Sequence, residues 1–277
     1  MKIALVDSGL GLLAAAAAVR RLRPDADLVL SGDPEGMPWG PRRPADITAR
    51  ALECARAAAA ERPDALIVAC NTASVHALPA LRAELEPEVP VIGTVPAVKP
   101  AAAAGAPFAV WATPATTGSP YQRRLIADFA RGLPVTEVPC DGLADAVERA
   151  DAAAVDAAVR AAAALTPREV AAVVLGCTHY ELVSATIQAR VAERTGGPVT
   201  LYGSAEAVAA QALRRIGESG RPPVSAGRGR LTVYAGGRPA RVPPGLLAYP
   251  EGAFLTGEHT GETARPWAPA ASPGSGG

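Results

Sequence analysis

The sequence has few aromatic residues, no net charge and no long apolar run. Phe, Trp and Tyr make up 4% of the 277 residues, and 27 Lys and Arg balance 27 Asp and Glu. A neutral chain lacks the basic surface that attracts nucleic acids or anionic membranes, so we expect neither as a partner. No stretch is apolar over the length that a membrane span requires.

The N-terminal segment resembles a signal peptide only superficially. Polar residues at 7–9 interrupt its apolar run, and two arginines follow it at 20–21. We therefore interpret residues 1–23 as strand, turn and helix, and expect a cytoplasmic protein.

The four cysteines form no paired motif. Cys54, Cys70, Cys140 and Cys177 lie far apart, and the three histidines do not cluster with them. The sequence therefore predicts neither a zinc site nor any other metal site. Cys54 falls in a helical pattern, and Cys140 lacks the Asn-Thr or Thr-His pair that follows the other two cysteines, so packing roles are favoured for both.

Apolar strand-like runs alternate with helical patterns for most of the length. This alternation predicts the α/β class, with parallel sheets covered by helices and ligands at the carboxyl ends of the strands. The expected strands are 2–7, 27–31, 64–69, 89–92, 108–112, 134–139, 170–175, 198–201 and one short strand in 230–237. The expected helices are 11–23, 45–61, 74–85, 119–131, 143–164, 182–195 and 204–217.

The chain also repeats itself. "KIALVDSG" and "PFAVWATP" both open with a strand that enters a turn, and Asp7 aligns with Ala112 at nearly the offset that aligns Cys70 with Cys177. We expect two similar α/β domains with the active site between them. The predicted division is 1–93, completed by about 204–245, then 94–203, and a tail at 246–277 with a disordered Pro/Gly/Ser-rich end.

Two matched cysteine motifs carry the functional signal. "LIVACNTAS" at 66–74 and "VLGCTHYEL" at 174–182 each place a thiol after an apolar strand and before a helix. Backbone N–H groups at such a helix start stabilise a thiolate. One such cysteine could merely fill space. Two equivalent acid/base groups suit a symmetric reaction, in which a proton leaves one face of a carbon and another arrives on the opposite face.

These residues resemble the signatures of glutamate racemases in the aspartate/glutamate racemase superfamily. The matching motifs cover about residues 1–217 and are "DSG" at 7–9, "ACNTAS" at 69–74, "PVIG" at 90–93, "ATPATTGSPY" at 112–121 and "LGCTHY" at 175–180. The resemblance implies an isomerase that interconverts L- and D-glutamate without a cofactor and supplies D-glutamate for peptidoglycan. It implies glutamate as the partner molecule, and a homodimer stays open.

The resemblance also implies roles for individual residues. Cys70 and Cys177 match the acid/base thiols, Asp7 and His179 match their assistants, and Glu148 matches a further assisting carboxylate. Simpler alternatives remain: a helix cap for Asp7, a structural hydrogen bond for His179 and a solvated position for Glu148. The positions implied to hold substrate are Ser8, Trp39, Gly40, Asn71, Thr72, Thr116 and Thr178.

Four positions depart from the family pattern and leave the substrate side chain open. Trp39 stands where Tyr is usual, Leu12 where Gly is usual, Glu181 where Pro is common, and Gly203 where Asp is common. The rival interpretations are an aspartate or hydantoin racemase, a maleate isomerase, a single-thiol decarboxylase, and a racemase-like binding protein without activity.

Overall fold

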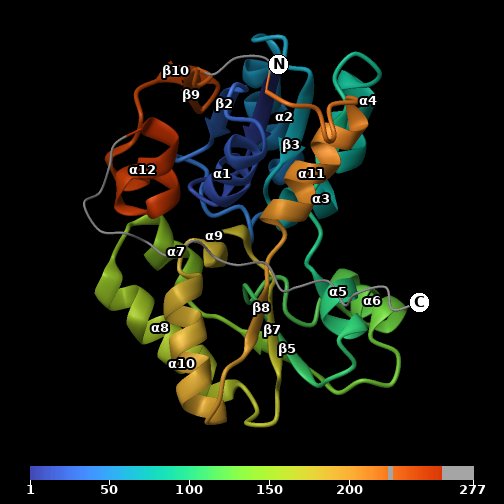
Figure 1. Ribbon diagram of the computed structural model, residues 1–277, viewed down its shortest axis with the longest axis vertical. Coiled ribbons are helices and arrows are strands. Elements are labelled where there is room, and N and C mark those ends of the chain that lie inside the picture. Colours follow the sequence, from blue (N-terminus) through green and yellow to red (C-terminus); the bar gives the residue numbers. More distant parts are fainter. Residues whose placement is uncertain (224–226, 258–277) are drawn as a thin grey trace.

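Two sheets organise the chain in the computed structural model, which describes residues 1–223 and 227–257 (Figure 1). The larger sheet has the strand order β10-β9-β2-β1-β3-β4 and the smaller one β6-β5-β7-β8. All pairings are parallel except that of β9 with β10. The strands are β1 Lys2–Val6, β2 Asp27–Gly32, β3 Ala65–Val68, β4 Val91–Gly93, β5 Phe108–Ala112, β6 Val135–Pro139, β7 Ala172–Leu175, β8 Thr200–Tyr202, β9 Leu231–Ala235 and β10 Arg238–Ala240.

Helices cover both faces of each sheet, as the apolar strands require. In the larger sheet, one side of the strands packs on α1 and α11 and the other on α2 and α4. In the smaller sheet, α7, α8 and α10 cover one side, and α5 and α6 the other. The helices are α1 Leu12–Leu22, α2 Pro44–Ala59, α3 Asn71–His76, α4 Leu78–Leu85, α5 Val98–Ala103, α6 Pro120–Phe129, α7 Leu143–Glu148, α8 Ala152–Leu165, α9 Thr178–Glu181, α10 Ser184–Thr195, α11 Ala205–Arg215 and α12 Pro250–Thr256, with a short 3₁₀ helix at Pro244–Ala248.

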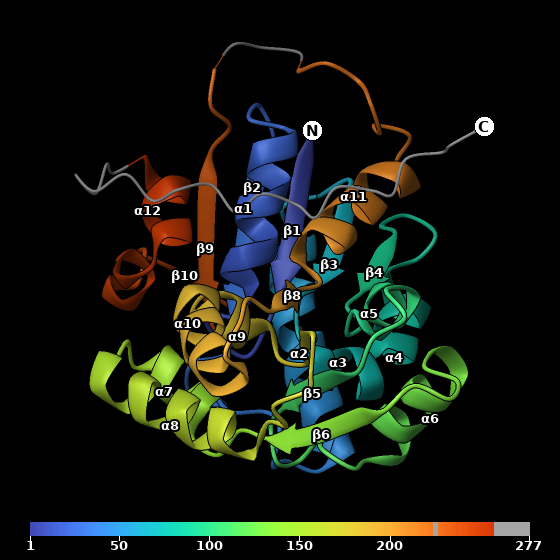
Figure 2. The same cartoon turned by 60° about the horizontal axis from the view of Figure 1, so that its bottom comes forward.

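The internal repeat is visible in the strand order. The strands β2-β1-β3-β4 of the larger sheet have the same order as β6-β5-β7-β8 of the smaller one. Cys70 follows β3 and Cys177 follows β7, so the two cysteines occupy equivalent positions. The two parts of the molecule meet below the larger sheet in Figure 1. Figure 2 shows β6, an edge strand of the smaller sheet, at the bottom of the view. The predicted fold class is confirmed, whereas the exact domain limits stay a prediction.

Several expected helices are divided. The pattern at 74–85 is two helices, α3 and α4, because Pro79 lacks the N–H that a continuous helix needs. The pattern at 143–164 divides into α7 and α8 at Ala150, which has a positive φ, and Asp151 caps α8. The pattern at 182–195 is α10, and the short helix α9 precedes it.

The C-terminal part holds structure that the sequence pattern did not predict. The single strand expected in 230–237 is β9, followed by a two-glycine turn and β10. Helix α12 lies in the segment assigned to the tail and packs on α1. The expected disorder of the Pro/Gly/Ser-rich end falls outside the described residues. In the described part of the chain, no helix has both the length and the apolar character to cross a membrane.

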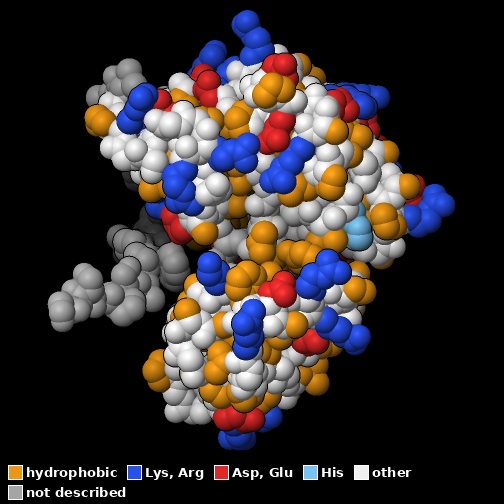
Figure 3. Space-filling model, turned by 90° about the vertical axis from the view of Figure 1, so that its right-hand side faces the viewer, with side chains coloured by type: hydrophobic (Ala, Val, Ile, Leu, Met, Phe, Trp, Pro, Cys, Tyr) orange, Lys and Arg blue, Asp and Glu red, His pale blue; other side chains and the backbone are white. Residues whose placement is uncertain are grey.

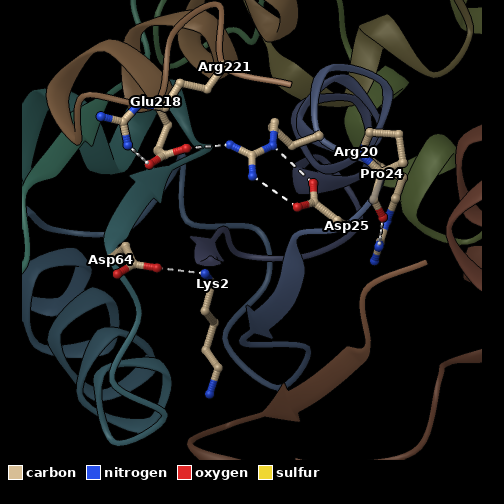
Figure 4. Close-up of polar contacts among 8 residues, drawn as sticks. Lys2, Arg20, Pro24, Asp25, Asp64, Glu218 and Arg221 are labelled. Atoms are coloured by element: carbon tan, nitrogen blue, oxygen red, sulfur yellow. Dashed lines mark hydrogen bonds and ion pairs between the residues drawn. The ribbon is translucent and has the colours of Figure 1, made fainter. Parts of the chain in front are cut away.

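An ion-pair network centred on the buried Arg23 ties the end of α1 to the end of α11. The guanidinium of Arg23 is 2.9 Å from Asp25 and 2.6 Å from Glu218. Glu218 also pairs with Arg221, and Figure 4 shows the Glu218 carboxylate between two guanidinium groups. The hydrogen bonds from Arg23 to Asp25 and Glu218 raise the pKa of Arg23 despite its burial. Arg23 thus stays charged and holds α11 against α1.

Candidate active site

A cavity of about 240 Å³ lies where the carboxyl ends of the strands from both sheets meet. Figure 3 shows the molecule narrowing between its two parts, with hydrophobic side chains at this waist. All the predicted site residues except Glu148 line the cavity. They are Asp7, Ser8, Trp39, Gly40, Cys70, Asn71, Thr72, Thr116, Cys177, Thr178 and His179.

Cys70 is the residue directly before α3. At this position a side chain faces backbone N–H groups that the helix leaves without acceptors, and the amide of Ala73 contacts the thiol. The side chain of Asp7 also lies within hydrogen-bonding reach of Cys70. Burial and the negative charge of Asp7 raise the pKa of Cys70 well above its ordinary value. The thiol form of Cys70 is therefore favoured over the thiolate.

Asp7 is fully buried at the end of β1. The amide of Ser8 donates to Oδ1 at 2.5 Å, and the hydroxyl of Thr178 donates to Oδ2 at 3.2 Å. Burial raises the pKa of Asp7, although the positive charge of His179 and the Ser8 hydrogen bond oppose this effect. Asp7 therefore connects the Cys70 side of the cavity to the residue next to Cys177.

Cys177 is the equivalent residue before α9 and has an imidazole beside it. Its Sγ is 3.9 Å from Nδ1 of His179, and Nε2 of His179 is 3.1 Å from Oε2 of Glu148. The amide of Leu10 donates to the same Glu148 oxygen at 2.7 Å. Glu148 thus reaches the site through His179 and not by lining the cavity.

The charges of His179 and Glu148 stabilise one another. Burial alone would lower the pKa of His179, but hydrogen bonds with Cys177 and Glu148 and the charge of Asp7 raise it well above the ordinary value. Burial alone would raise the pKa of Glu148, but the hydrogen bond and charge of His179 lower it. The imidazolium form of His179 is therefore favoured. The two thiols therefore have opposite environments: a carboxylate beside Cys70 and a cation beside Cys177.

Apart from Asp145, the rest of the lining offers neutral hydrogen-bonding groups. Within the described residues, no lysine or arginine lines the cavity, and its polar groups are mainly hydroxyls and amides. The side-chain amide of Asn71 donates to the carbonyl oxygen of Gly176 at 2.9 Å, which leaves its buried Oδ1 without a partner. Thr113 donates to Thr116 at 3.2 Å across the opposite loop. Such groups suit a small polar ligand such as an amino acid.

Trp39 and Gly40 form a loop over the cavity. Trp39 is 1% exposed, and its indole N–H donates to Asp33 at 2.8 Å. Arg50 pairs with the same carboxylate at 2.9 Å. Gly40 lies close to Thr113 and Ala115 of the other part. The indole N–H is therefore directed to Asp33, and the tryptophan contributes an apolar surface to the cavity.

Sequence reasoning missed several residues of this site. Gly11 is the most constrained: a Cβ there would lie 2.2 Å from Asp7, 2.5 Å from Thr178 and 2.6 Å from His179. Cys140, expected to be a packing residue, and Asp145 also line the cavity. "DSGLG" was a visible signal for Gly11, but the pattern could not show which side chains surround it.

No metal centre emerges from the described ranges, because they contain no group of three or more His, Cys, Asp or Glu side chains arranged to hold a metal ion. The ring nitrogens of His179 contact Cys177 and Glu148 instead.

Comparisons with known proteins agree with this geometry. Residues 12–212 match the Asp/Glu/Hydantoin racemase family model, and the chain belongs to this family. The resemblance to glutamate racemases is confirmed: that of Vibrio campbellii is 36% identical over 75% of this chain and 77% of the relative, and that of Roseiflexus sp. is 34% identical over 86% and 88%. The expectation of an isomerase of the racemase type is confirmed with it.

Solved structures show the same architecture. Escherichia coli glutamate racemase, in complex with L-glutamate and the activator UDP-MurNAc-ala, has a TM-score of 0.73 at 27% identity and covers 89% of this chain and 91% of its own. Glutamate racemase from Thermus thermophilus, in complex with beta-chloro-D-alanine, has a TM-score of 0.64 at 30% identity, with 93% of each chain covered.

Proposed function

We propose that this chain is a cofactor-independent glutamate racemase that supplies D-glutamate for peptidoglycan. The observation that supports this function best is the pair of equivalent thiols, Cys70 and Cys177, on one cavity with different assistants. The relatives that bear the name glutamate racemase support glutamate as the substrate.

The proposed reaction is two proton transfers at Cα. One thiolate removes the Cα proton while the opposite thiol donates its proton to the other face, and the electron pair of the broken C–H bond forms the new one. Asp7 assists Cys70, and His179 with Glu148 assists Cys177. Ser8, Asn71, Thr72, Thr116 and Thr178 hold the carboxylates and the ammonium group by neutral hydrogen bonds, and the 39–40 loop covers them.

A cytoplasmic location, where thiols remain reduced, belongs to this proposal. A homodimer stays a prediction. The relatives' names favour glutamate over aspartate and hydantoins, although Trp39 leaves side-chain selectivity to experiment.

The deciding experiment follows exchange at Cα in deuterium oxide. Purified protein is incubated with D- or L-glutamate without added cofactor, and deuterium incorporation and optical rotation are recorded. We expect both to proceed from either enantiomer. Exchange with aspartate alone would overturn the assignment of glutamate as the substrate. Absence of exchange with every amino acid tested would overturn the proposed racemase activity.

A further inference from the structure

Glu181 connects the thiol Cys177 to a distant helix. It is the last residue of α9, and its carboxylate accepts hydrogen bonds from the amide and the hydroxyl of Ser204, each at 2.8 Å. It also accepts from the amide of Ala205 at 3.3 Å. These amides begin α11, where a helix leaves its N–H groups without backbone acceptors. Ser204 makes no side-chain cap of its own, so Glu181 caps α11 from another part of the chain.

Helix α11 packs on the larger sheet, which belongs to the part of the molecule that carries Cys70. It lies against α1 and β3. Arg21 of α1 pairs with Glu206 of α11 at 2.6 Å, and Arg23 pairs with Glu218 just beyond its end. Because α9 follows the smaller sheet, the hydrogen bonds of Glu181 join the segment that carries Cys177 to the part that carries Cys70.

Gly203 leaves the space that the Glu181 carboxylate occupies. A Cβ on Gly203 would lie 2.5 Å from Oε2 of Glu181, closer than atoms can approach. Both positions depart from the family pattern, and the Glu181 carboxylate lies where a side chain at position 203 would begin. Burial raises the pKa of Glu181, and the Ser204 hydrogen bonds oppose that effect. Arg21, Glu206 and Glu251 line the same small cavity beside it.

We propose that Glu181 is a positioning residue: by capping α11 it holds α9, and with it Cys177 and His179, in register with Cys70. The absence of a side chain at Gly203 is a requirement of this arrangement. The inference rests on the proposed racemase function, but its first readout does not depend on turnover.

The first test compares Glu181→Ala with Glu206→Ala, which removes a carboxylate from the same helix without touching α9. Alkylation of each thiol by iodoacetamide is followed by peptide mass spectrometry in the substrate-free protein. We expect Glu181→Ala to accelerate alkylation of Cys177 at least about threefold, because a loosened α9 exposes a half-buried thiol. Cys70 should keep its rate in both variants, and Glu206→Ala should change neither thiol. Equal alkylation of Cys177 in parent and Glu181→Ala would overturn the proposal even if racemisation proved absent.

The second test is a double-variant cycle on kcat. Gly203→Asp alone should lower kcat on the order of tenfold, because its side chain meets the Glu181 carboxylate. In the Glu181→Ala background the same aspartate has room and brings a carboxylate to the start of α11, so kcat should rise above that of Glu181→Ala alone. Equal losses from Gly203→Asp in both backgrounds would contradict the coupling. If Glu181→Ala does not fold, Glu181→Ser, which also removes the carboxylate and leaves its space free, replaces it in both tests.

Discussion

Asn71 and Gly176, the neighbours of the two thiols, are joined by a hydrogen bond of 2.9 Å from the Asn71 amide to the Gly176 carbonyl oxygen. Asn71 follows Cys70, and Gly176 precedes Cys177. The bond therefore crosses between the two equivalent strand ends beside the proposed reacting groups. The bond also fixes the orientation of the Asn71 side chain, whose Oδ1 has no hydrogen-bond partner. This oxygen is an acceptor suited to an ammonium group.

Removal of this link should weaken both catalysis and stability. Asn71→Ala leaves a buried carbonyl oxygen without its partner, which costs about 1–3 kcal/mol. We expect a lower melting temperature and a fall in kcat/KM on the order of tenfold or more. Gln188→Ala is the matched control, because that side-chain amide donates to the carbonyl oxygen of Val199 away from the cavity. Similar losses of kcat/KM in both variants would contradict a specific role for Asn71.

The two thiols should be indispensable in both directions. Cys70→Ser and Cys177→Ser replace a thiol with a hydroxyl, a much weaker acid at neutral pH, and should lower kcat on the order of 10³-fold or more. Cys54 is the control: it is a buried residue of α2, and burial raises its pKa to about 12. Cys54→Ala should keep most of the activity. Initial rates by circular dichroism measure all three, and a Cys177→Ser variant with near-parental activity would contradict the two-thiol mechanism.

Gly11 should tolerate no side chain. The Cβ of Gly11→Ala would overlap Asp7, Thr178 and His179, so the assistants of both thiols must move. We expect kcat to fall on the order of 10²-fold, since displacement of catalytic groups by about 1 Å has effects of that size. Gly197→Ala is the control, because a Cβ at that position meets nothing within 4 Å. Parental kinetics in Gly11→Ala would show that the Asp7–Thr178–His179 arrangement is unnecessary for the reaction.

The fold and the two thiols were predictable from the sequence for a physical reason. Parallel strands place their carboxyl ends at one edge, so cysteines after β3 and β7 could be assigned to ligand-facing positions before any geometry was known. The repeat indicated that the two positions were equivalent. Hydrophobic periodicity and the alternation of strands with helices are local properties, and the sequence displays them directly.

Long-range contacts within the site were not predictable in the same way. Glu148 and His179 belong to different helices, and no local pattern indicates that their side chains meet at 3.1 Å. The direction of the Trp39 indole depends on Asp33, and the glutamate at 181 acquires a role only through Ser204. Helix α12 is too short to show a strong period, and its packing against α1 stabilises it.

Glu148 should keep His179 protonated. In Glu148→Gln the negative charge is lost, so the pKa of His179 should fall toward its ordinary value. Two-dimensional NMR of the imidazole resonances during a pH titration measures this shift, with the exposed His76 as internal control. An unchanged His179 titration would show that Glu148 does not act through the imidazole.

The same pair predicts a pH window for stability. The folded-state pKa of Glu148 is lowered, so its contribution is present above its unfolded pKa of about 4.3 and is lost as pH falls through the folded value. The folded-state pKa of His179 is raised. The contribution of His179 to stability is therefore complete below about pH 6.5 and is lost as pH rises through the folded pKa. The melting-temperature difference between parent and Glu148→Gln should therefore be largest between these limits and shrink on both sides. A difference independent of pH would contradict the ion pair.

Each assistant should serve its own thiol. Asp7 lies beside Cys70 and His179 beside Cys177, and the two racemisation directions begin from opposite protonation states of the thiols. His179→Asn and Asp7→Asn should therefore lower kcat unequally in the two directions, with opposite preference. Because the equilibrium between enantiomers is fixed at unity, the losses of kcat/KM must be equal in both directions, and any inequality in kcat must appear in KM as well. Measurement of kcat and KM from L- and from D-glutamate for both variants tests this prediction. Identical kcat losses in both directions for both variants would show that the two side chains act on the site as a whole.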